Sequence, residues 1–359
     1  MKKLKKFLTL MLAFAFIMIF APAKSAFAAD IPAKGSITDT IAYSKLYTVS
    51  YDGNKYYNLK VTKSGVVTIN IADKGSETWF SAGDTYYIYD QAGNKYLEGY
   101  VDSKDSKIYS TSLCAGDYIL CIETPREGHH IAAQFTVNYA AAKESFADSL
   151  INKHDDTVSP AILKTSVDGF MATLDTKDVY KFTLKADKKV TLKFATLEIP
   201  EAYMKVFKSN GDDIVEYTDL KTGSNNRSII LKKGVYYIQI ESYDSACGQY
   251  TLSAKTSAVP SVKLKSLKND KNNKYYSAKT INVKWSKRAE ASAYQIRYSV
   301  KANFKKSKID TIENYYTTAA IKELKAKKVY YVKVRAVYKV GEANVYSKWS
   351  NVKKIRTSK

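Results

Sequence analysis

The chain carries the same series of segments twice, at a nearly constant spacing. LCAGDYILCIE at 113–123, for example, returns as LKKGVYYIQIE at 231–241. Three further pairs correspond in the same order: 57–72 with 180–195, 89–94 with 207–212, and 134–137 with 249–252. The offsets lie between 115 and 123 residues, which is the size of a folding domain and too long for a solenoid repeat. The sequence therefore predicts two duplicated domains, over 36–142 and 143–256, the second opening with a linker.

The first 28 residues have the organisation of a secretory signal peptide. Four lysines within the first six residues precede an apolar run over 7–21, and a small-residue site follows at 26–28. An uncleaved membrane anchor is the alternative, but the run is short for a span of about 20 residues. We expect cleavage after Ala28, no transmembrane segment in the mature chain, and a secreted protein associated with the cell surface.

Positive charge is concentrated in the last third of the chain. The formal net charge is +22, from 57 lysines and arginines against 35 acidic residues. Residues 30–256 hold 26 basic and 29 acidic residues, whereas residues 257–359 hold 26 and 6. Such an asymmetry concerns partners rather than fold, so the last third is expected to contact polyanions.

Apolar residues alternate with polar ones through both repeats, which is typical of β-strands with one buried face. The alternating positions are Tyr57, Leu59, Val61, Val67, Ile69 and Ile71, with Tyr180, Phe182, Leu184, Val190, Leu192 and Phe194 as counterparts. Glycines 93, 116, 211 and 234 mark turns that favour positive φ. A short helix is expected only within 143–154. The pattern predicts an all-β protein of antiparallel sandwiches.

The repeated unit resembles the bacterial pre-peptidase C-terminal domain. The resemblance rests on DVYKFTL (178–184), VFKSNGD (206–212), LKKGVYYIQI (231–240) and GQYTLSA (248–254). The first unit departs from the pattern, with Lys55 in place of Asp178. The resemblance implies compact, jelly-roll-like β-sandwiches without catalytic activity, some of whose relatives bind matrix proteins or polysaccharide, sometimes with calcium.

Residues 258–359 resemble a fibronectin type III domain, which implies a C-terminal immunoglobulin-like sandwich. Trp285 matches the core tryptophan, and Leu324 precedes Tyr330 by six residues, as at the family's tyrosine corner, although Lys325 replaces the usual proline. There is no Arg-Gly-Asp tripeptide. The segment YSKWS (346–350) resembles the tryptophan-serine box of cytokine-receptor domains, which implies that Arg297 or Arg335 stacks on Trp349.

Catalytic chemistry is poorly represented, so we expect a protein that is not an enzyme. The only histidines are His129, His130 and His154, and neither a Gly-x-Ser-x-Gly elbow nor an H-E-x-x-H helix occurs. The loop pair His129–His130 is interpreted as solvated rather than as a metal site. A Cys114–Cys121 disulfide across a turn stays open, with Cys247 then free.

No cofactor is expected, although calcium is not excluded. The densest acid pairs are Asp155–Asp156 and Asp212–Asp213. Neither pair has the spacing of a known calcium loop, and solvated turn acids are the favoured interpretation.

Candidate binding residues fall into two classes. The aromatic candidates for stacking on sugar or peptide are Trp79, Tyr87 and Tyr89, although ordinary sheet surface is the favoured interpretation of these rings. The cationic candidates for polyanions are Lys305, Lys306, Lys325, Lys327, Lys328, Lys333 and Arg335. The equal alternative is that these cations only keep the sandwich soluble. The expected partners are wall polyanions, extracellular polysaccharide or matrix protein, and not nucleic acid.

The sequence thus suggests a secreted, non-catalytic adhesion protein of the bacterial surface. In this hypothesis the tandem sandwiches act as recognition or spacer modules. The alternative is an accessory, substrate-binding component of a secreted peptidase or glycosidase system.

Overall fold

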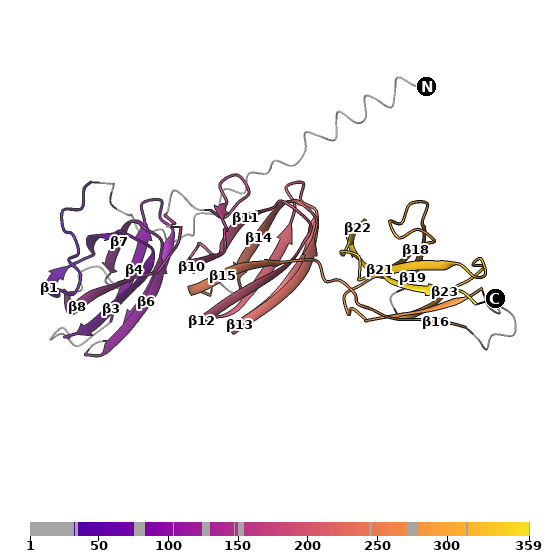
Figure 1. The fold of residues 1–359 in the computed structure, drawn as a ribbon. Coiled ribbons are helices and arrows are strands. Elements are labelled where there is room, and N and C mark those ends of the chain that lie inside the picture. The colour runs from indigo at the N-terminus through magenta and orange to yellow at the C-terminus, as the bar shows by residue number, and fades with distance from the viewer. Residues whose placement is uncertain are drawn as a thin grey trace, which may run out of the picture.

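The computed structural model describes residues 32, 35–74, 83–102, 104–123, 130–146, 148–149, 154–243, 246–270, 279–313 and 315–358. The predicted all-β fold class is confirmed, since antiparallel sheets form sandwich-like domains that follow one another along the molecule (Figure 1). No helix occurs in the described ranges, so the short helix expected within 143–154 is absent from the described part of that segment. Nor does any described helix have the length and apolarity to cross a membrane. The leader at 1–28 lies outside the described residues.

The first sandwich consists of two four-stranded sheets, ordered β1-β8-β3-β6 and β2-β7-β4-β5. Its strands are β1 (Leu46–Asp52), β2 (Lys55–Val61), β3 (Gly65–Asp73), β4 (Asp84–Asp90), β5 (Lys95–Val101), β6 (Ser106–Leu113), β7 (Gly116–Glu123) and β8 (His130–Ala141). The period-two pattern holds: Val67, Ile69 and Ile71 are buried in the core between the sheets. Alternation along β3 thus directs every second side chain inward, as the sequence predicts.

The second sandwich repeats this pairing with longer strands. Its strands are β9 (Ala161–Ile162), β10 (Ser166–Met171), β11 (Lys177–Leu184), β12 (Lys188–Phe207), β13 (Asp213–Leu231), β14 (Gly234–Ser242) and β15 (Gly248–Ser257). β12 pairs with β15 through its first half and with β14 through its second, and the break in its pairing with β13 falls between Thr196 and Glu201. The single strand β12 therefore corresponds to β3 and β4 together, and the repeated sequence produces a repeated topology.

The third sandwich packs a three-stranded sheet, β16-β17-β20, against a five-stranded one, β19-β18-β21-β22 with β23 beside β21. Its strands are β16 (Leu264–Asn269), β17 (Ile281–Trp285), β18 (Ala293–Ser299), β19 (Lys308–Glu313), β20 (Thr318–Ile321), β21 (Val329–Val340), β22 (Ala343–Tyr346) and β23 (Lys353–Arg356). Trp285 lies in the core against Tyr294. The Lys325 backbone N–H donates to the Tyr330 hydroxyl at 2.9 Å, a bond that proline at this position could not make.

The glycine turns follow the sequence expectation in part. Gly93 and Gly211, at equivalent turns, have φ of 88° and 84°. Gly116 and Gly234 are not among the positive-φ residues. Each of these two begins a strand paired in register from its first residue, Gly116 with Val61 and Gly234 with Leu184, so their backbone is already extended and the expectation of positive φ there is wrong.

The first two sandwiches are joined by direct contacts as well as by the chain. Cys114 of the first packs with Phe170 and Ala172 of the second in a small apolar cluster. The Thr173 N–H donates to the Ser112 carbonyl at 2.9 Å. Described residues of the connecting segment contact both sandwiches: Asp148 accepts from Ala115 of the first, and Ser145 donates to Asp168 of the second. These contacts position the buried polar cluster described below.

Candidate functional site

Three cations form a row on the outward face of the five-stranded sheet. Arg297 of β18 is the cross-strand partner of Lys333 in β21, and Arg335 follows two residues further along β21. The intervening Val332 and Val334 are fully buried, because successive side chains of a strand point to opposite faces. The outward orientation that the sequence predicts for Lys333 and Arg335 is therefore present.

Aromatic rings lie in cation–π contact with the side chains of this cationic row. Around Trp349, the guanidinium carbons of Arg335 and Arg297 lie 4.5 Å and 6.0 Å from the ring centroid. The stacking of Arg335 or Arg297 on Trp349, expected from the sequence, is thus confirmed, with Arg335 the closer. Arg335 also lies 3.9 Å from the Tyr346 ring centroid, and the Lys333 ammonium lies 4.1 Å from that of Phe304.

The cations of the row differ in their hydrogen bonds. Arg335 donates twice to Gln295 Oε1, at 2.9 and 2.7 Å, and Arg297 Nε donates to Ser307 Oγ at 2.7 Å. Within the described residues no carboxylate forms an ion pair with Arg297, Lys333 or Arg335. Burial, together with the neighbouring charges of Arg297 and Arg335, lowers the pKa of Lys333. The positive charge of the row is thus not neutralised by an ion pair with any described carboxylate.

The other predicted lysines gather at one end of the third sandwich. Lys305 and Lys306 lie in the loop after β18, whereas Lys325, Lys327 and Lys328 lie in the loop before β21, and all five are exposed. Since β18 and β21 are antiparallel and end Ser299 opposite Tyr331, the two loops lie at the same end. The last strand adds Arg356, opposite Val329. This is the end marked by the C-terminus, away from the second sandwich (Figure 1).

The aromatic candidates of the first sandwich do not form an exposed pair. Tyr87 and Tyr89 stack with ring centroids 5.4 Å apart on the face of β4 opposite the core, but Tyr89 is only 6% exposed. Its ring lies against Tyr87, and its strand position is opposite the fully buried Ile119. The expectation that both rings are free for stacking is wrong for Tyr89. Trp79 lies outside the described residues.

The acid pairs proposed for calcium are engaged locally. Asp156 accepts the backbone N–H groups of Val158 and Ser159 at 2.8 and 2.9 Å. Asp212 accepts from the Asn210 side chain at 2.9 Å, while Asp213 pairs with Lys205 at 3.0 Å. Asp155 lies in the linker beside Asp156, and the Asp212–Asp213 pair lies at the β12–β13 turn. The two pairs belong to separate turns.

None of the three cysteines forms a disulfide. Cys114 directly follows β6, and Cys121 lies within β7, so the extended strand holds them apart and the Cys114–Cys121 disulfide left open by the sequence is not formed. The Cys114 thiol instead donates to Asp175 Oδ2 at 2.9 Å, across the junction between the first two sandwiches.

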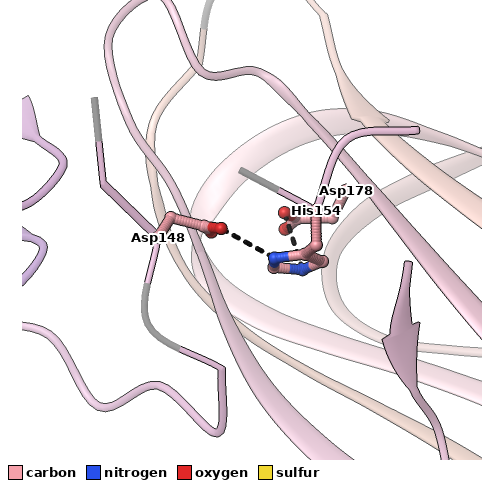
Figure 2. A group of neighbouring side chains, drawn as sticks. All are labelled: Asp148, His154 and Asp178. Carbon is pink, nitrogen blue, oxygen red and sulfur yellow. Dashed lines mark hydrogen bonds and ion pairs between the residues drawn. The ribbon is translucent and has the colours of Figure 1, made fainter. Parts of the chain in front are cut away.

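A buried charged cluster lies at that junction, and the sequence did not predict it. Asp148 and His154 come from the connecting segment and Asp178 from β11 (Figure 2). The three residues are 2%, 9% and 2% exposed. His154 Nδ1 lies 2.7 Å from Asp148 Oδ1, and His154 Nε2 lies 3.0 Å from Asp178 Oδ1. The imidazole is thus held between two carboxylates.

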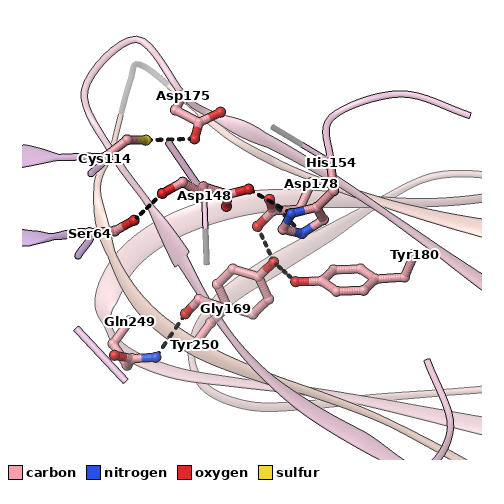
Figure 3. Close-up of polar contacts among 10 residues, drawn as sticks. All are labelled: Ser64, Cys114, Asp148, His154, Gly169, Asp175, Asp178, Tyr180, Gln249 and Tyr250. Atoms are coloured by element: carbon pink, nitrogen blue, oxygen red, sulfur yellow. Dashed lines mark hydrogen bonds and ion pairs between the residues drawn. The ribbon is translucent and has the colours of Figure 1, made fainter. Parts of the chain in front are cut away.

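Two tyrosines extend the cluster into the core of the second sandwich (Figure 3). The Tyr250 hydroxyl donates to Asp178 Oδ2, and the hydroxyls of Tyr250 and Tyr180 lie 2.6 Å apart. Gly169 leaves room for this contact, since a Cβ there would come within 2.5 Å of the Tyr250 hydroxyl. A side chain at that position would therefore displace the polar network.

The first sandwich also contacts the cluster. The Asp148 carbonyl accepts hydrogen bonds from Ser64 Oγ at 3.1 Å and from the Ala115 N–H at 3.4 Å. On the other side, the His154 carbonyl accepts the Val179 N–H of β11 at 2.8 Å. The Asp148–His154 contact therefore joins a stretch of linker docked on the first sandwich to a stretch docked on the second.

Burial and mutual charge shift the titration of the cluster. Burial disfavours the charge on His154, but the hydrogen bond to Asp148 and the charge of Asp178 outweigh it and raise the pKa of the imidazole to about 9. Burial also raises the pKa of Asp178, against the opposing effect of His154. Glu144, close by on the linker, has its pKa raised to about 7 by burial and by Asp148.

One difference between the two repeats points to this cluster in the sequence. Tyr57 pairs with Leu120 in the first sandwich as Tyr180 pairs with Ile238 in the second. Counting two residues back, Lys55 occupies the position of Asp178. A charge reversal inside an otherwise repeated strand marks a place where the second unit has acquired an interaction of its own.

The chain is only distantly similar to known structures. No protein-family model matches it, and no curated protein matches it. The pre-peptidase C-terminal domain of a Bacillus anthracis collagenase is 21% identical over 27% of this chain and 92% of its own, with a TM-score of 0.25. A segment of two fibronectin type III domains from chicken tenascin is 13% identical over 51% of this chain and 99% of its own, with a TM-score of 0.30. The FN1–FN3 domains of chicken CNTN1 are 12% identical over 86% of this chain and 98% of their own, with a TM-score of 0.25.

Proposed function

We propose that this chain is an exported, non-catalytic binding protein that attaches to anionic polymers at the bacterial surface through its third sandwich. The single observation that carries the proposal is the gathering of cations from separate segments on one end and one adjoining face of that domain. Lys305 and Lys306 come from one loop, Lys325, Lys327 and Lys328 from another, and Lys333 from the adjoining strand face. A dense cationic surface attracts polyanions over long distances.

The charge distribution along the chain supports this polarity. Residues 257–359 carry 26 basic and 6 acidic residues, while residues 30–256 carry 26 and 29. The first two sandwiches would therefore add little to the attraction. The first two sandwiches contact each other directly through Ser112–Thr173 and Cys114–Asp175. They would therefore act as a spacer between the basic third sandwich and the N-terminal end of the protein.

The accessory role in a peptidase or glycosidase system remains the second candidate, because the second sandwich carries an exposed aromatic group. Tyr203 packs edge-on against Tyr217 and Tyr243, each pair with ring centroids 5.8 Å apart. Tyr217 is 55% exposed and Tyr243 is 45% exposed. Rings presented in this way suit contact with a glycan or a peptide.

The test compares two full-length mature variants with the wild-type chain. In the first, Lys305, Lys306, Lys325, Lys327 and Lys328 are changed to glutamine. In the matched control, the five exposed lysines Lys60, Lys63, Lys104, Lys164 and Lys185 of the other two sandwiches are changed instead. The readout is the salt concentration that elutes each protein from immobilised wall teichoic acid and from heparin.

We expect the first variant to elute at clearly lower salt and the control to elute with the wild type. Retention should also weaken steeply with salt, since exposed charges are screened over about 8–10 Å at physiological ionic strength. Equal retention of both variants, or retention that ignores salt, would refute the proposal. Binding to neutral glycans that is lost on changing Tyr217 or Tyr243 to alanine would favour the accessory role.

A further inference from the structure

Three buried polar atoms without a hydrogen-bond partner meet at the junction cluster. Among the described residues seven side-chain atoms are of this kind, and Glu144 Oε1, Asp148 Oδ2 and His154 Nε2 are three of them. Buried polar atoms are nearly always satisfied, because leaving one unpaired costs free energy. Three such atoms within one group of titratable side chains indicate a bound species that pairs with them.

The cluster is also short of positive charge. Glu144, Asp148, Asp175 and Asp178 all act electrostatically on His154 or on one another, and within this group of five described side chains His154 is the only cation. Asp175 is engaged by the Cys114 thiol. A single imidazolium offsets only one of the remaining carboxylates.

The geometry of His154 is that of a metal ligand held by a carboxylate. Asp148 Oδ1 fixes Nδ1 at 2.7 Å, which orients the ring and leaves Nε2 as the donor atom. Nε2 lies 3.0 Å from Asp178 Oδ1 yet makes no hydrogen bond. Two donor atoms at this separation can instead share an ion, because bonds of about 2.0–2.2 Å place neighbouring ligands about 3 Å apart.

We propose that His154 Nε2, Asp178 and Glu144 bind one divalent transition-metal ion of the zinc type, while Asp148 orients the imidazole through Nδ1. Donor atoms of Asp148, His154 and Asp178 all lie within 4.8 Å of one another. One imidazole nitrogen with carboxylate oxygens suits Zn²⁺, whereas Ca²⁺ and Mg²⁺ favour sites made of oxygen alone. Glu144 contributes the unpaired Oε1, while Ser64 binds its carboxylate.

Such an ion would fasten the first two sandwiches together. Glu144 is hydrogen-bonded by Ser64 of the first, and His154 is anchored to β11 of the second by Val179. The ion would bridge these two anchored stretches of linker. Its role is structural, and it would stabilise the junction whenever the metal is bound.

The experiment uses the mature full-length protein, stripped with a chelator and dialysed. Zn²⁺ is titrated by calorimetry, and Co²⁺ serves as a spectroscopic substitute. We expect one equivalent of either metal, a raised melting temperature, visible d–d absorption, and a paramagnetically shifted imidazole proton from one histidine. The His154→Gln variant should bind zinc at least about 10–100-fold more weakly.

Two further variants separate this site from other histidines and from misfolding. His129→Gln/His130→Gln should leave binding unchanged, and Glu144→Gln, which alters a half-buried residue and keeps His154, should weaken it. Absence of zinc and cobalt uptake by the wild-type protein would overturn the proposal. So would uptake that survives His154→Gln, uptake lost only with His129 and His130, or calcium binding that does not depend on His154.

Discussion

Tyr250 in the second sandwich is the sequence counterpart of Phe135 in the first, since QFTV at 134–137 returns as QYTL at 249–252. Phe135 pairs with Tyr47 of β1, and Tyr250 pairs with Gly169 of β10, the corresponding strand of the second sandwich. Both rings are buried. The added hydroxyl of Tyr250 reaches Asp178 and Tyr180, so one core position is apolar in one repeat and polar in the other.

Replacing Tyr250 with phenylalanine should therefore destabilise the second sandwich. The change restores the chemistry of the first repeat but removes the donor to Asp178, which is buried. An unsatisfied buried group costs about 1–3 kcal/mol, and urea unfolding measures the loss. Tyr236→Phe is the control, because its hydroxyl bonds only the part-buried Lys232 carbonyl. Equal losses in the two variants would contradict the argument.

Stability should fall as the pH rises from about 6 to 10. The folded-state pKa of His154 is raised to about 9, so the stability that its pairing contributes is fully present below its unfolded pKa of about 6.5 and is lost through pH 9. Glu144, whose pKa is raised to about 7, acts in the same direction at lower pH: its contribution is lost between its unfolded pKa of about 4.3 and pH 7. Melting temperatures measured with a chelator present should decline across this range. The decline above pH 8 should flatten in His154→Gln, and an unchanged profile in that variant would exclude His154 as its source.

A separate carboxylate limits the stability of the first sandwich. Asp84 is 4% exposed, and burial and the charge of Asp73 raise its pKa to about 7. Stability is therefore lost as the pH rises from about 4 to 7, because the unfolded chain releases this proton more readily. Asp84→Asn should stabilise the protein by about 1–3 kcal/mol at pH 8 and by little at pH 4. The exposed Asp102→Asn should have no effect at either pH, and a gain for Asp84→Asn that is equal at both pH values would contradict the mechanism.

The sequence predicts the fold well because its strongest signals are local and repeated. Alternation in GVVTINI places Val67, Ile69 and Ile71 in the core, and the spacing from Leu324 to Tyr330 precedes a strand whose tyrosine hydroxyl binds the loop at Lys325. These features depend on residues close in sequence, or on pairing that the duplication shows twice.

The junction cluster could not be predicted in the same way. Asp148, His154 and Asp178 become neighbours only when the linker docks against both sandwiches, and no spacing in the sequence encodes that docking. Tyr89 is a similar case. Alternation alone places Tyr89 on an outward face, but its burial depends on contacts with Tyr87 and with its strand neighbour Ile119. Tertiary contacts decide both cases.

The aromatic rings of the cationic row should stabilise the third sandwich without being needed for attachment. Trp349→Ala removes the ring beside Arg335, Lys333 and Arg297, whose cation–π contacts contribute about 0.5–1 kcal/mol each at exposed sites. A double-mutant cycle of Trp349→Ala with Arg335→Gln, followed by urea unfolding, should give a coupling energy of about 0.5–1 kcal/mol. Trp349→Ala should still be retained on heparin close to the wild-type salt concentration, because the five loop lysines remain. If heparin retention falls as far in Trp349→Ala as in the variant lacking those lysines, the ring is needed for attachment and this prediction is wrong.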